Sequence, residues 1–199
     1  QNQVNDAIGL SFSKMLKHVL RQDPDIIMVG EIRDRDTAEI AVQASLTGHL
    51  VLSTLHTNDA VGALSRMMDM GVEPYLLSSA LAGVIAQRLV RGICADCKQT
   101  FLAPTELLER FQWPAGTLIS KGRGCSSCYD SGYRGRLGIH EIIESSDSLQ
   151  RLMAKAPNKE ELTSFMKREK YATLFDDGLR RVLEGKTTVE EIYRVIHAE

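Results

Sequence analysis

The order of apolar and polar positions along the chain predicts a sheet covered by helices. Residues 26–29 (IIMV) and residues 50–53 (LVLS) are two short apolar runs. The length and β-branched content of the first are typical of a strand that is buried on both faces, as in a parallel sheet. Apolar residues recur at helical spacing around these runs, over residues 11–22, 35–47, 59–70 and 74–90. This alternation predicts an α/β fold, a parallel sheet with flanking helices.

Capping and turn residues delimit the predicted helices. Pro24 ends the first helix, because proline cannot continue it. Asp34 or Asp36 caps the start of the second helix, and Gly48 closes its end. A turn over residues 71–74 separates the third helix from the fourth.

Residues 92–138 differ in character from the rest, since glycines, prolines and all four cysteines gather there with little periodicity. We interpret this stretch as a small inserted module. Helical patterns return beyond it, over residues 147–155, 158–169, 171–184 and 188–197. Thr187 and Glu190 have the spacing of a capping box before the last of them. We therefore expect three parts: residues 1–91, 92–138 and 139–199.

The four cysteines form two Cys-x-x-Cys pairs, Cys94 with Cys97 and Cys125 with Cys128, separated by 27 residues. Each pair can direct two thiolates toward the same tetrahedral ion. Four sulfur ligands leave no position open for water, so a metal bound here would be structural. The spacing predicts one zinc ion.

Glycines beside the cysteines support a metal site. Gly92, Gly122 and Gly124 allow tight turns in which backbone amides approach the sulfur atoms. Two disulfides, or cysteines paired only by chance, are the alternatives. We favour zinc because residues 1–10 lack the basic start and apolar core of a secretory signal, and metal-binding cysteine pairs suit a reducing compartment.

A zinc ribbon can also bind nucleic acid. From Arg88 to Arg136 there are eight basic and four acidic residues, a local surplus of four positive charges. Tyr129 and Tyr133 lie among them and would suit stacking on exposed bases. The other interpretation is a module that braces a larger domain, and we favour it.

Polar residues follow both predicted strands. Glu31 stands directly after the first strand, and Arg33 follows it two residues later. His56 lies in the polar loop after the second strand. Ligand sites of open α/β sheets lie at the carboxyl ends of the strands, and a carboxylate there can orient or deprotonate an attacking water in phosphoryl transfer. The combination predicts a catalytic site, with Glu31, His56 and Arg33 as candidates.

Structural roles remain open for the same residue types. Glu31 could cap a helix, and His49, directly after Gly48, could be a turn histidine. A complete ATPase also needs a phosphate-binding loop. The segment Gly185-Lys186-Thr187 fails that pattern, because Arg180 stands where the first glycine is required and the segment falls between two helices. The chain therefore holds part of a nucleotide site at most.

Composition sets further limits. The net charge of -2, from 24 basic and 26 acidic residues, argues against a globally basic nucleic-acid binder or a polyacidic tail. With 43% hydrophobic residues the chain can bury a full core, and no run of eighteen apolar residues predicts a membrane span. The chain begins with Gln1 instead of Met, so we expect a piece of a longer protein.

Several motifs together resemble the type II secretion and type IV pilus assembly ATPases. They are LRQDPD at 20–25, MVGEIRD at 28–34, TGH at 47–49, LHTN at 55–58, IAQRL at 85–89, GYRGR at 132–136 and GIHE at 138–141. With the cysteine pairs, the likeness covers nearly the whole chain. The resemblance implies a RecA-like core, an inserted four-cysteine zinc module and a C-terminal helical subdomain.

The resemblance also implies roles for individual residues. Glu31 would be the Walker B glutamate, with Gly30 where many other ATPases have aspartate. Residues 47–56 would be the His box that senses the terminal phosphate. His56 is the preferred phosphate-sensing residue and His49 the second choice.

Four arginines match family positions that lie around the nucleotide or between subunits: Arg21, Arg33, Arg66 and Arg136. We expect Arg21, Arg66 and Arg136, with His49, to bind the nucleotide. Lys17 stands where relatives often carry arginine, which would weaken a bidentate phosphate contact.

The family's function supplies the remaining expectations. The parent would be a cytoplasmic hexameric motor that uses ATP and Mg²⁺ to drive pilus assembly or type II secretion. It would work with inner-membrane platform and adaptor proteins, would reach the membrane peripherally through N-terminal regions, and would bind no nucleic acid directly. The cysteine module favours an assembly motor over a retraction motor. Without the upstream phosphate-binding loop and Asp box, the 199-residue chain should be inactive and monomeric. A zinc-ribbon interaction module and a DNA-uptake or conjugation motor remain the alternatives.

Overall fold

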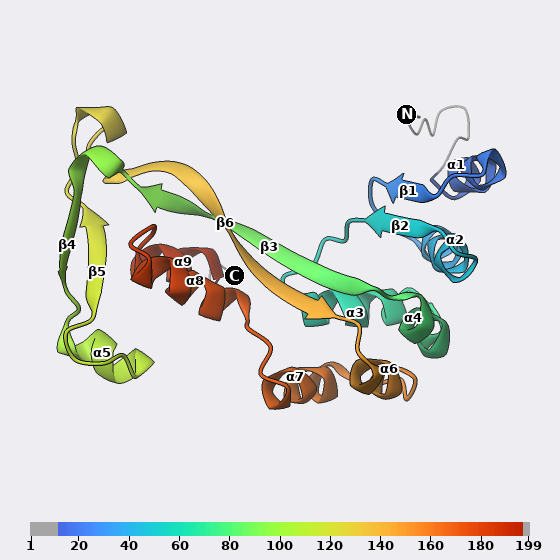
Figure 1. The fold of residues 1–199 in the computed structure, drawn as a ribbon. Helices are drawn as coiled ribbons and strands as arrows, with labels where there is room; N and C mark the ends of the chain where they lie inside the picture. Colours follow the sequence, from blue (N-terminus) through green and yellow to red (C-terminus); the bar gives the residue numbers. More distant parts are fainter. Residues whose placement is uncertain (1–11, 197–199) are drawn as a thin grey trace. The chain divides into compact units, whose positions relative to one another are not determined.

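The computed structural model describes residues 12–196, which form two compact units (Figure 1). The first unit joins the described residues up to Val84 with Ile143–Tyr171, and the second joins Ile85–Ile142 with those from Ala172 onward. The units do not coincide with the three ranges expected from the sequence, because the helices after residue 139 divide between them. The division into 1–91, 92–138 and 139–199 stays a prediction.

The first unit contains the predicted parallel strands. Strand β1 (Ile26–Val29) pairs with β2 (Leu50–Ser53), so that Ile26 faces Leu50 and Val29 faces Ser53. The helical elements of this unit are α1 (Phe12–Val19) with a 3₁₀ turn at Leu20–Gln22, α2 (Arg35–Leu46), α3 (Ala60–Asp69), α4 (Pro74–Ala80), α6 (Asp147–Met153) and α7 (Lys159–Arg168). The predicted α/β class is confirmed.

Strand β1 is buried on one face only, so the prediction of burial on both faces is wrong for this strand within the described residues. Ile27 and Val29 are 4% and 6% exposed, whereas Ile26 and Met28 are 61% and 77% exposed. Alternate strand residues point to opposite faces of a sheet, and within the described chain α1 and α2 lie on one side of this two-stranded sheet (Figure 1).

The expected helix boundaries near the strands are confirmed. Asp34 caps α2, because its carboxylate accepts the Thr37 N–H at 2.8 Å. Gly48 follows the helix with a φ of 103°, a conformation that favours glycine. Asp59 caps α3 in the same way by accepting the N–H of Gly62. These caps fix where the loops after β1 and β2 enter their helices.

The predicted helix over residues 74–90 is wrong beyond Ala80. Helix α4 ends there, and the chain continues as strand β3 (Gly83–Ile93), which pairs with β6 (Tyr133–Glu144). The exposure of β3 alternates from residue to residue. A partner strand some fifty residues later in the sequence overrides the local helical spacing.

Residues 92–138 are more regular than their sequence pattern indicates. Strand β4 (Lys98–Leu102) pairs antiparallel with β5 (Leu118–Gly122), with Lys98 opposite Gly122 and Leu102 opposite Leu118. Between them lies α5 (Thr105–Phe111), and 3₁₀ turns at Ala95–Cys97 and Ser126–Cys128 hold the cysteines.

The core of the second unit joins the β3 and β6 strands to α8 (Leu174–Leu183) and α9 (Val189–Ile196). Its fully buried members include Val90, Ile139 and Ile192. Thr188 caps α9, since its hydroxyl accepts the Glu191 N–H, so the capping box predicted for Thr187 and Glu190 is off by one residue. The Thr187 hydroxyl donates instead to the carbonyl of Arg91. Within residues 12–196, none of the helices is both long enough and apolar enough to cross a membrane.

Candidate functional site

The segments that follow β1 and β2 stay side by side beyond the strands. Ile32, which is 7% exposed, donates its N–H to the carbonyl of Thr54 at 3.0 Å. The Thr54 hydroxyl donates to the carbonyl of Gly30 at 2.6 Å. These two bonds extend the pairing of the strands and hold the residues at their carboxyl ends in register.

Glu31, Arg33 and His56 meet at this edge of the sheet. Arg33 Nε lies 2.5 Å from Glu31 Oε2, and His56 Nε2 lies 3.0 Å from the same oxygen. Residues 31 and 33 share one side of an extended segment, while Ile32 between them is buried on the other. The structure thus brings together the three residues predicted to be catalytic.

The electrostatics of this cluster favour a charged carboxylate. The hydrogen bond from Arg33, aided by His56, holds the pKa of Glu31 below its ordinary value although partial burial opposes the shift. The Glu31 side chain is 20% exposed, whereas those of Arg33 and His56 are 69% and 81% exposed. Both contacts fall on Oε2. A shielded carboxylate can accept a proton, and the exposed Arg33 and His56 side chains beside it can donate to an anion.

The other predicted nucleotide-binding residues lie elsewhere. His49 precedes β2, at the opposite end of the strand from His56, and its Nδ1 lies 2.9 Å from the Ala44 carbonyl. Arg21 is exposed on the 3₁₀ turn before β1, and Arg66 is exposed on α3. Arg136 is exposed on β6 in the second unit. Within the described part of the first unit, the residues that contact Glu31 are Arg33 and His56, and His49, Arg21 and Arg66 are not among them.

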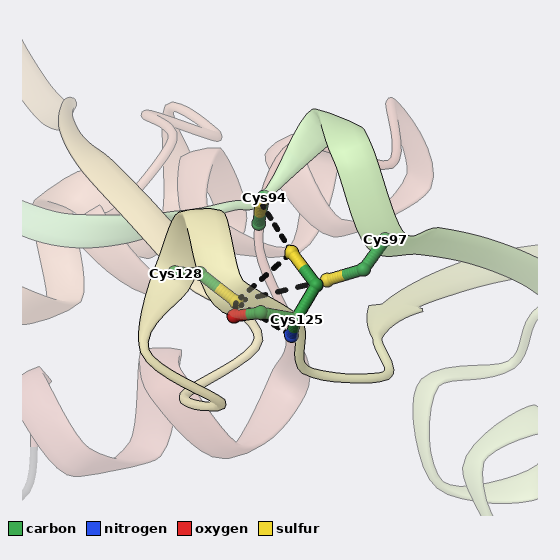
Figure 2. A group of neighbouring side chains, drawn as sticks. All are labelled: Cys94, Cys97, Cys125 and Cys128. Atoms are coloured by element: carbon green, nitrogen blue, oxygen red, sulfur yellow. Dashed lines mark hydrogen bonds between the residues drawn. The ribbon is translucent and has the colours of Figure 1, made fainter.

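The four cysteines converge in the second unit (Figure 2). Their sulfur atoms all lie within 4.8 Å of one another. The Sγ atoms of Cys94 and Cys125 are 3.9 Å apart, those of Cys97 and Cys128 3.8 Å, and those of Cys125 and Cys128 3.7 Å. A tetrahedron of sulfurs about 2.3 Å from a central zinc has edges of about 3.8 Å. The donor set and its spacing fit a zinc ion.

Backbone amides surround the sulfur cluster. The N–H of Gly124 donates to Cys97 Sγ at 3.3 Å, and that of Cys125 donates to Cys128 Sγ at 3.2 Å. Gly124 has a φ of 96°, and a Cβ atom there would lie 2.8 Å from the carbonyl oxygen of Asp130. The expected role of this glycine, a tight turn that brings an amide to a sulfur, is therefore observed.

The cysteines differ in acidity. Burial raises the pKa of the Cys97 thiol to about 11. Burial also opposes ionisation of Cys128, but the N–H groups of Cys125 and Gly132 outweigh it and lower the pKa of Cys128 to about 7. Amides that donate to sulfur stabilise the thiolate, the form that binds a metal.

The second unit also contains a buried ionic cluster that the sequence pattern did not reveal. Glu191, 1% exposed, accepts the Arg91 N–H at 2.9 Å and contacts the guanidinium groups of Arg91 and Arg194. These bonds lower the pKa of Glu191 to about 2 against the effect of burial. The spacing of Glu191 and Arg194 along α9 was visible in the sequence, but the partner on β3 was not.

Two solved structures share this fold. The pilus retraction motor PilT with bound ADP superimposes with a TM-score of 0.64 and 26% sequence identity, over 92% of this chain and 42% of that one. The Legionella pneumophila ATPase DotB gives a TM-score of 0.66 at 20% identity, over 95% and 43%. The chain therefore has part of the α/β fold found in these P-loop ATPases.

The chain belongs to the family described as "Type II/IV secretion system protein", whose sequence profile matches residues 1–194. It is 51% identical, over all of its length, to the type II secretion system protein E of Pseudomonas aeruginosa. It is 46% identical over 96% of its length to the type IV pilus assembly ATPase PilB of Thermus thermophilus. It spans 40% of the length of the first relative and 22% of the second. The resemblance inferred from the motifs is confirmed.

Proposed function

We propose that this chain is the part of a secretion or pilus-assembly ATPase that carries the water-activating carboxylate and the phosphate-sensing histidine. The observation that supports the proposal most is the meeting of Glu31, Arg33 and His56 at the carboxyl ends of two parallel strands. Family membership supports the proposed reaction class, hydrolysis of ATP, for which Mg²⁺ would be the metal cofactor. The phosphate-binding loop would come from residues outside the sequence printed here.

In the proposed mechanism Glu31 orients a water molecule and accepts its proton as the water oxygen attacks the terminal phosphorus. The bond from that phosphorus to the bridging oxygen of ADP breaks, and ADP and phosphate leave. His56 and Arg33, both exposed beside the carboxylate, would contact the phosphate oxygens and offset their negative charge. Mg²⁺ bound with ATP would neutralise further phosphate charge.

The predicted nucleotide-binding residues outside the Glu31 cluster would act together with other subunits or domains of the whole protein. Arg21, Arg66 and Arg136 are exposed, so they would reach nucleotide from a neighbouring subunit or from another domain arrangement. His49 contributes least in this proposal, because its ring nitrogen already bonds within the turn after α2. We keep it as the second candidate for phosphate sensing.

The cysteine cluster would hold one structural zinc ion through Cys94, Cys97, Cys125 and Cys128. The sulfur spacing and the amides aimed at two of the sulfurs support this assignment. A bound zinc would supply a cross-link between the two cysteine turns and no chemistry of hydrolysis. Metal analysis of protein purified without chelator should find one zinc per chain, and none after Cys128→Ser.

The whole protein would be a cytoplasmic homo-hexamer attached peripherally to the inner membrane. It would pass motion to membrane platform and adaptor proteins that feed subunits into a filament. Relatives from both secretion and pilus systems match this chain, so both remain within the proposal. The 199-residue chain alone would be inactive and monomeric.

The test compares ATP hydrolysis by the 199-residue chain with that of a longer protein extended upstream through the phosphate-binding loop. We expect turnover only in the longer protein, and loss of turnover in its Glu31→Gln variant. Steady hydrolysis by the short chain that Glu31→Gln abolishes would overturn the proposed inactivity. A longer protein without ATPase activity would overturn the proposed function.

A zinc-ribbon module that binds nucleic acid is the second candidate, and Tyr129, 94% exposed beside the cysteine cluster, favours it. This candidate predicts salt-sensitive binding of a single-stranded oligonucleotide that Tyr129→Ala weakens and Glu31→Gln leaves unchanged. Stimulation of the longer protein's ATPase by the oligonucleotide would instead indicate a DNA-directed motor.

A further inference from the structure

Arg33 occupies the oxygen of Glu31 that the proposed chemistry needs. Its guanidinium lies 2.5 Å from Oε2, and His56 shares the same oxygen. A carboxylate bound to a guanidinium is a poorer proton acceptor, since the positive charge stabilises the ionised form. In this arrangement, a resting state for the proposed reaction, both contacts fall on the oxygen of Glu31 that would receive the proton.

The backbone around this contact is held by hydrogen bonds, so a change in the side chain of Arg33 is the simplest way to release Glu31. Ile32 is buried and bonded to Thr54, and Asp34 caps α2 one residue after Arg33. The Arg33 side chain, in contrast, is 69% exposed. An ion pair that water reaches this freely is weak and exchanges readily with another anion. Arg33 can therefore turn from Glu31 to a ligand without moving the strand.

We propose that Arg33 is a displaceable latch on Glu31, which the terminal phosphate of a bound nucleoside triphosphate draws away, leaving Oε2 free to receive the proton of the attacking water. The inference rests on the proposed function for its ligand. A terminal phosphate carries more negative charge than a carboxylate and accepts a guanidinium in the same bidentate way. Arg33 is a positioning residue for Glu31 in the resting state and a phosphate contact afterwards.

The latch couples substrate binding to the availability of the base. Before nucleotide binds, Glu31 is paired with Arg33 and is a poorer base for activating water. After binding, the guanidinium follows the phosphate, and His56 has the same choice of partners because it is also exposed beside Oε2. Within the described residues, the charged or titratable groups that face Glu31 are Arg33 from its own segment and His56 from the loop after β2. Asp34, the nearest acid along the chain, is turned toward Thr37.

The resting contact is tested on the 199-residue chain by following the carboxyl carbon of Glu31 with NMR across pH. Arg33→Gln should shift the titration of Glu31 to higher pH. Arg35→Gln is the matched control, because Arg35 is equally exposed but pairs with Glu39. It should leave the titration unchanged. A Glu31 titration that is the same with and without Arg33 would overturn the latch.

Release is tested on the longer protein through the pH dependence of ATP hydrolysis. The profile of kcat/KM reports the free enzyme, and that of kcat reports the enzyme with substrate bound. The latch predicts that the acid limb of kcat/KM lies at lower pH than that of kcat. Arg33→Gln should bring the two limbs closer together and raise KM, with His56 keeping part of the difference. Limbs that coincide in the unaltered protein, or that stay as far apart in Arg33→Gln as in the unaltered protein, would contradict release by phosphate.

The two arms separate failure of the latch from failure of the proposed function. If the unaltered longer protein does not hydrolyse ATP, the proposed function is refuted, and so is the release of Glu31 by phosphate. The NMR titration still decides whether Arg33 holds Glu31. If hydrolysis occurs and depends on Glu31, but Glu31 titrates at the same pH in the parent chain and in Arg33→Gln, only the latch is wrong.

Discussion

Replacing Glu191 with glutamine should destabilise the second unit at neutral pH. The Glu191 carboxylate is fully buried and receives the backbone N–H of Arg91 and the guanidinium groups of Arg91 and Arg194. It thereby joins β3 to α9. Glu191→Gln keeps the shape of the side chain but removes its charge, and it places an amide donor against donors.

The magnitude follows from the pKa of Glu191, which these bonds lower from 4.5 to about 2. A difference of this size corresponds to about 3 kcal/mol of folding free energy at pH 7. Water screens part of the interaction, because the Arg91 and Arg194 side chains are 45% and 56% exposed. We therefore expect a loss of about 2 kcal/mol.

The pH dependence has a definite sign. The folded-state pKa of Glu191 lies below the ordinary value, so its stabilisation is present above pH 4.5 and is lost as the pH falls toward 2. The difference in unfolding free energy between the parent chain and Glu191→Gln should fall by roughly half between pH 5 and pH 3.

Urea unfolding followed by tryptophan fluorescence measures this directly. Trp113 is the only tryptophan of the chain and packs against the core of the second unit, so its emission reports that unit. Glu190→Gln is the control, since Glu190 is the exposed neighbour on the same helix. A difference below about 0.5 kcal/mol at pH 7, within the range of ordinary surface substitutions, would refute the reasoning.

Three further predictions concern caps and the cysteine cluster. Thr188→Ala removes the cap of α9 and the bond to the Tyr133 hydroxyl, and should cost about 1 kcal/mol in the same urea assay. Asp34→Ala removes the cap of α2 and should lower the thermal stability of the first unit by a similar amount, about 1 kcal/mol, while Asp34→Asn largely preserves it. Gly124→Ala places a Cβ against the Asp130 carbonyl and should lower zinc content, with Gly116→Ala, at a site with no neighbour within 4 Å, as the control.

The sequence predicts the parts of this fold that local signals determine. The strands at 26–29 and 50–53 are short apolar runs, and the helix between them has a cap at Asp34 and a glycine at its end. The helices after residue 146 also carry their own caps, at Ser146, Asn158 and Thr173. Each of these features depends on residues within a few positions of one another.

The strands β3 and β6 were missed because their pairing is non-local. Residues 83–90 contain apolar side chains that satisfy both helical and alternating spacing, and the choice is made by a partner beyond residue 132. The exposed face of β1 was mispredicted for a related reason. An apolar run predicts that a strand is buried, but it does not show which described element packs on each face of that strand.

The candidate site could be predicted in its chemistry but not in its contacts. The positions of Glu31 and His56 after two parallel strands made their proximity expected. The sequence did not show that Arg33 and His56 would share one carboxylate oxygen, or that the His49 ring would bond to the Ala44 carbonyl. Those facts depend on side-chain direction and register.

Single-turnover hydrolysis tests the central claim most directly. The longer protein with its phosphate-binding loop is mixed with ATP as the unaltered form, as Glu31→Gln, and as Glu39→Gln, a control glutamate on α2 that pairs with Arg35. Because general-base catalysis contributes about 100-fold to 10,000-fold, we predict that Glu31→Gln slows hydrolysis by at least about 100-fold with ATP binding retained, while Glu39→Gln does not. An unchanged rate in Glu31→Gln would contradict the assignment of Glu31 as the water-activating residue.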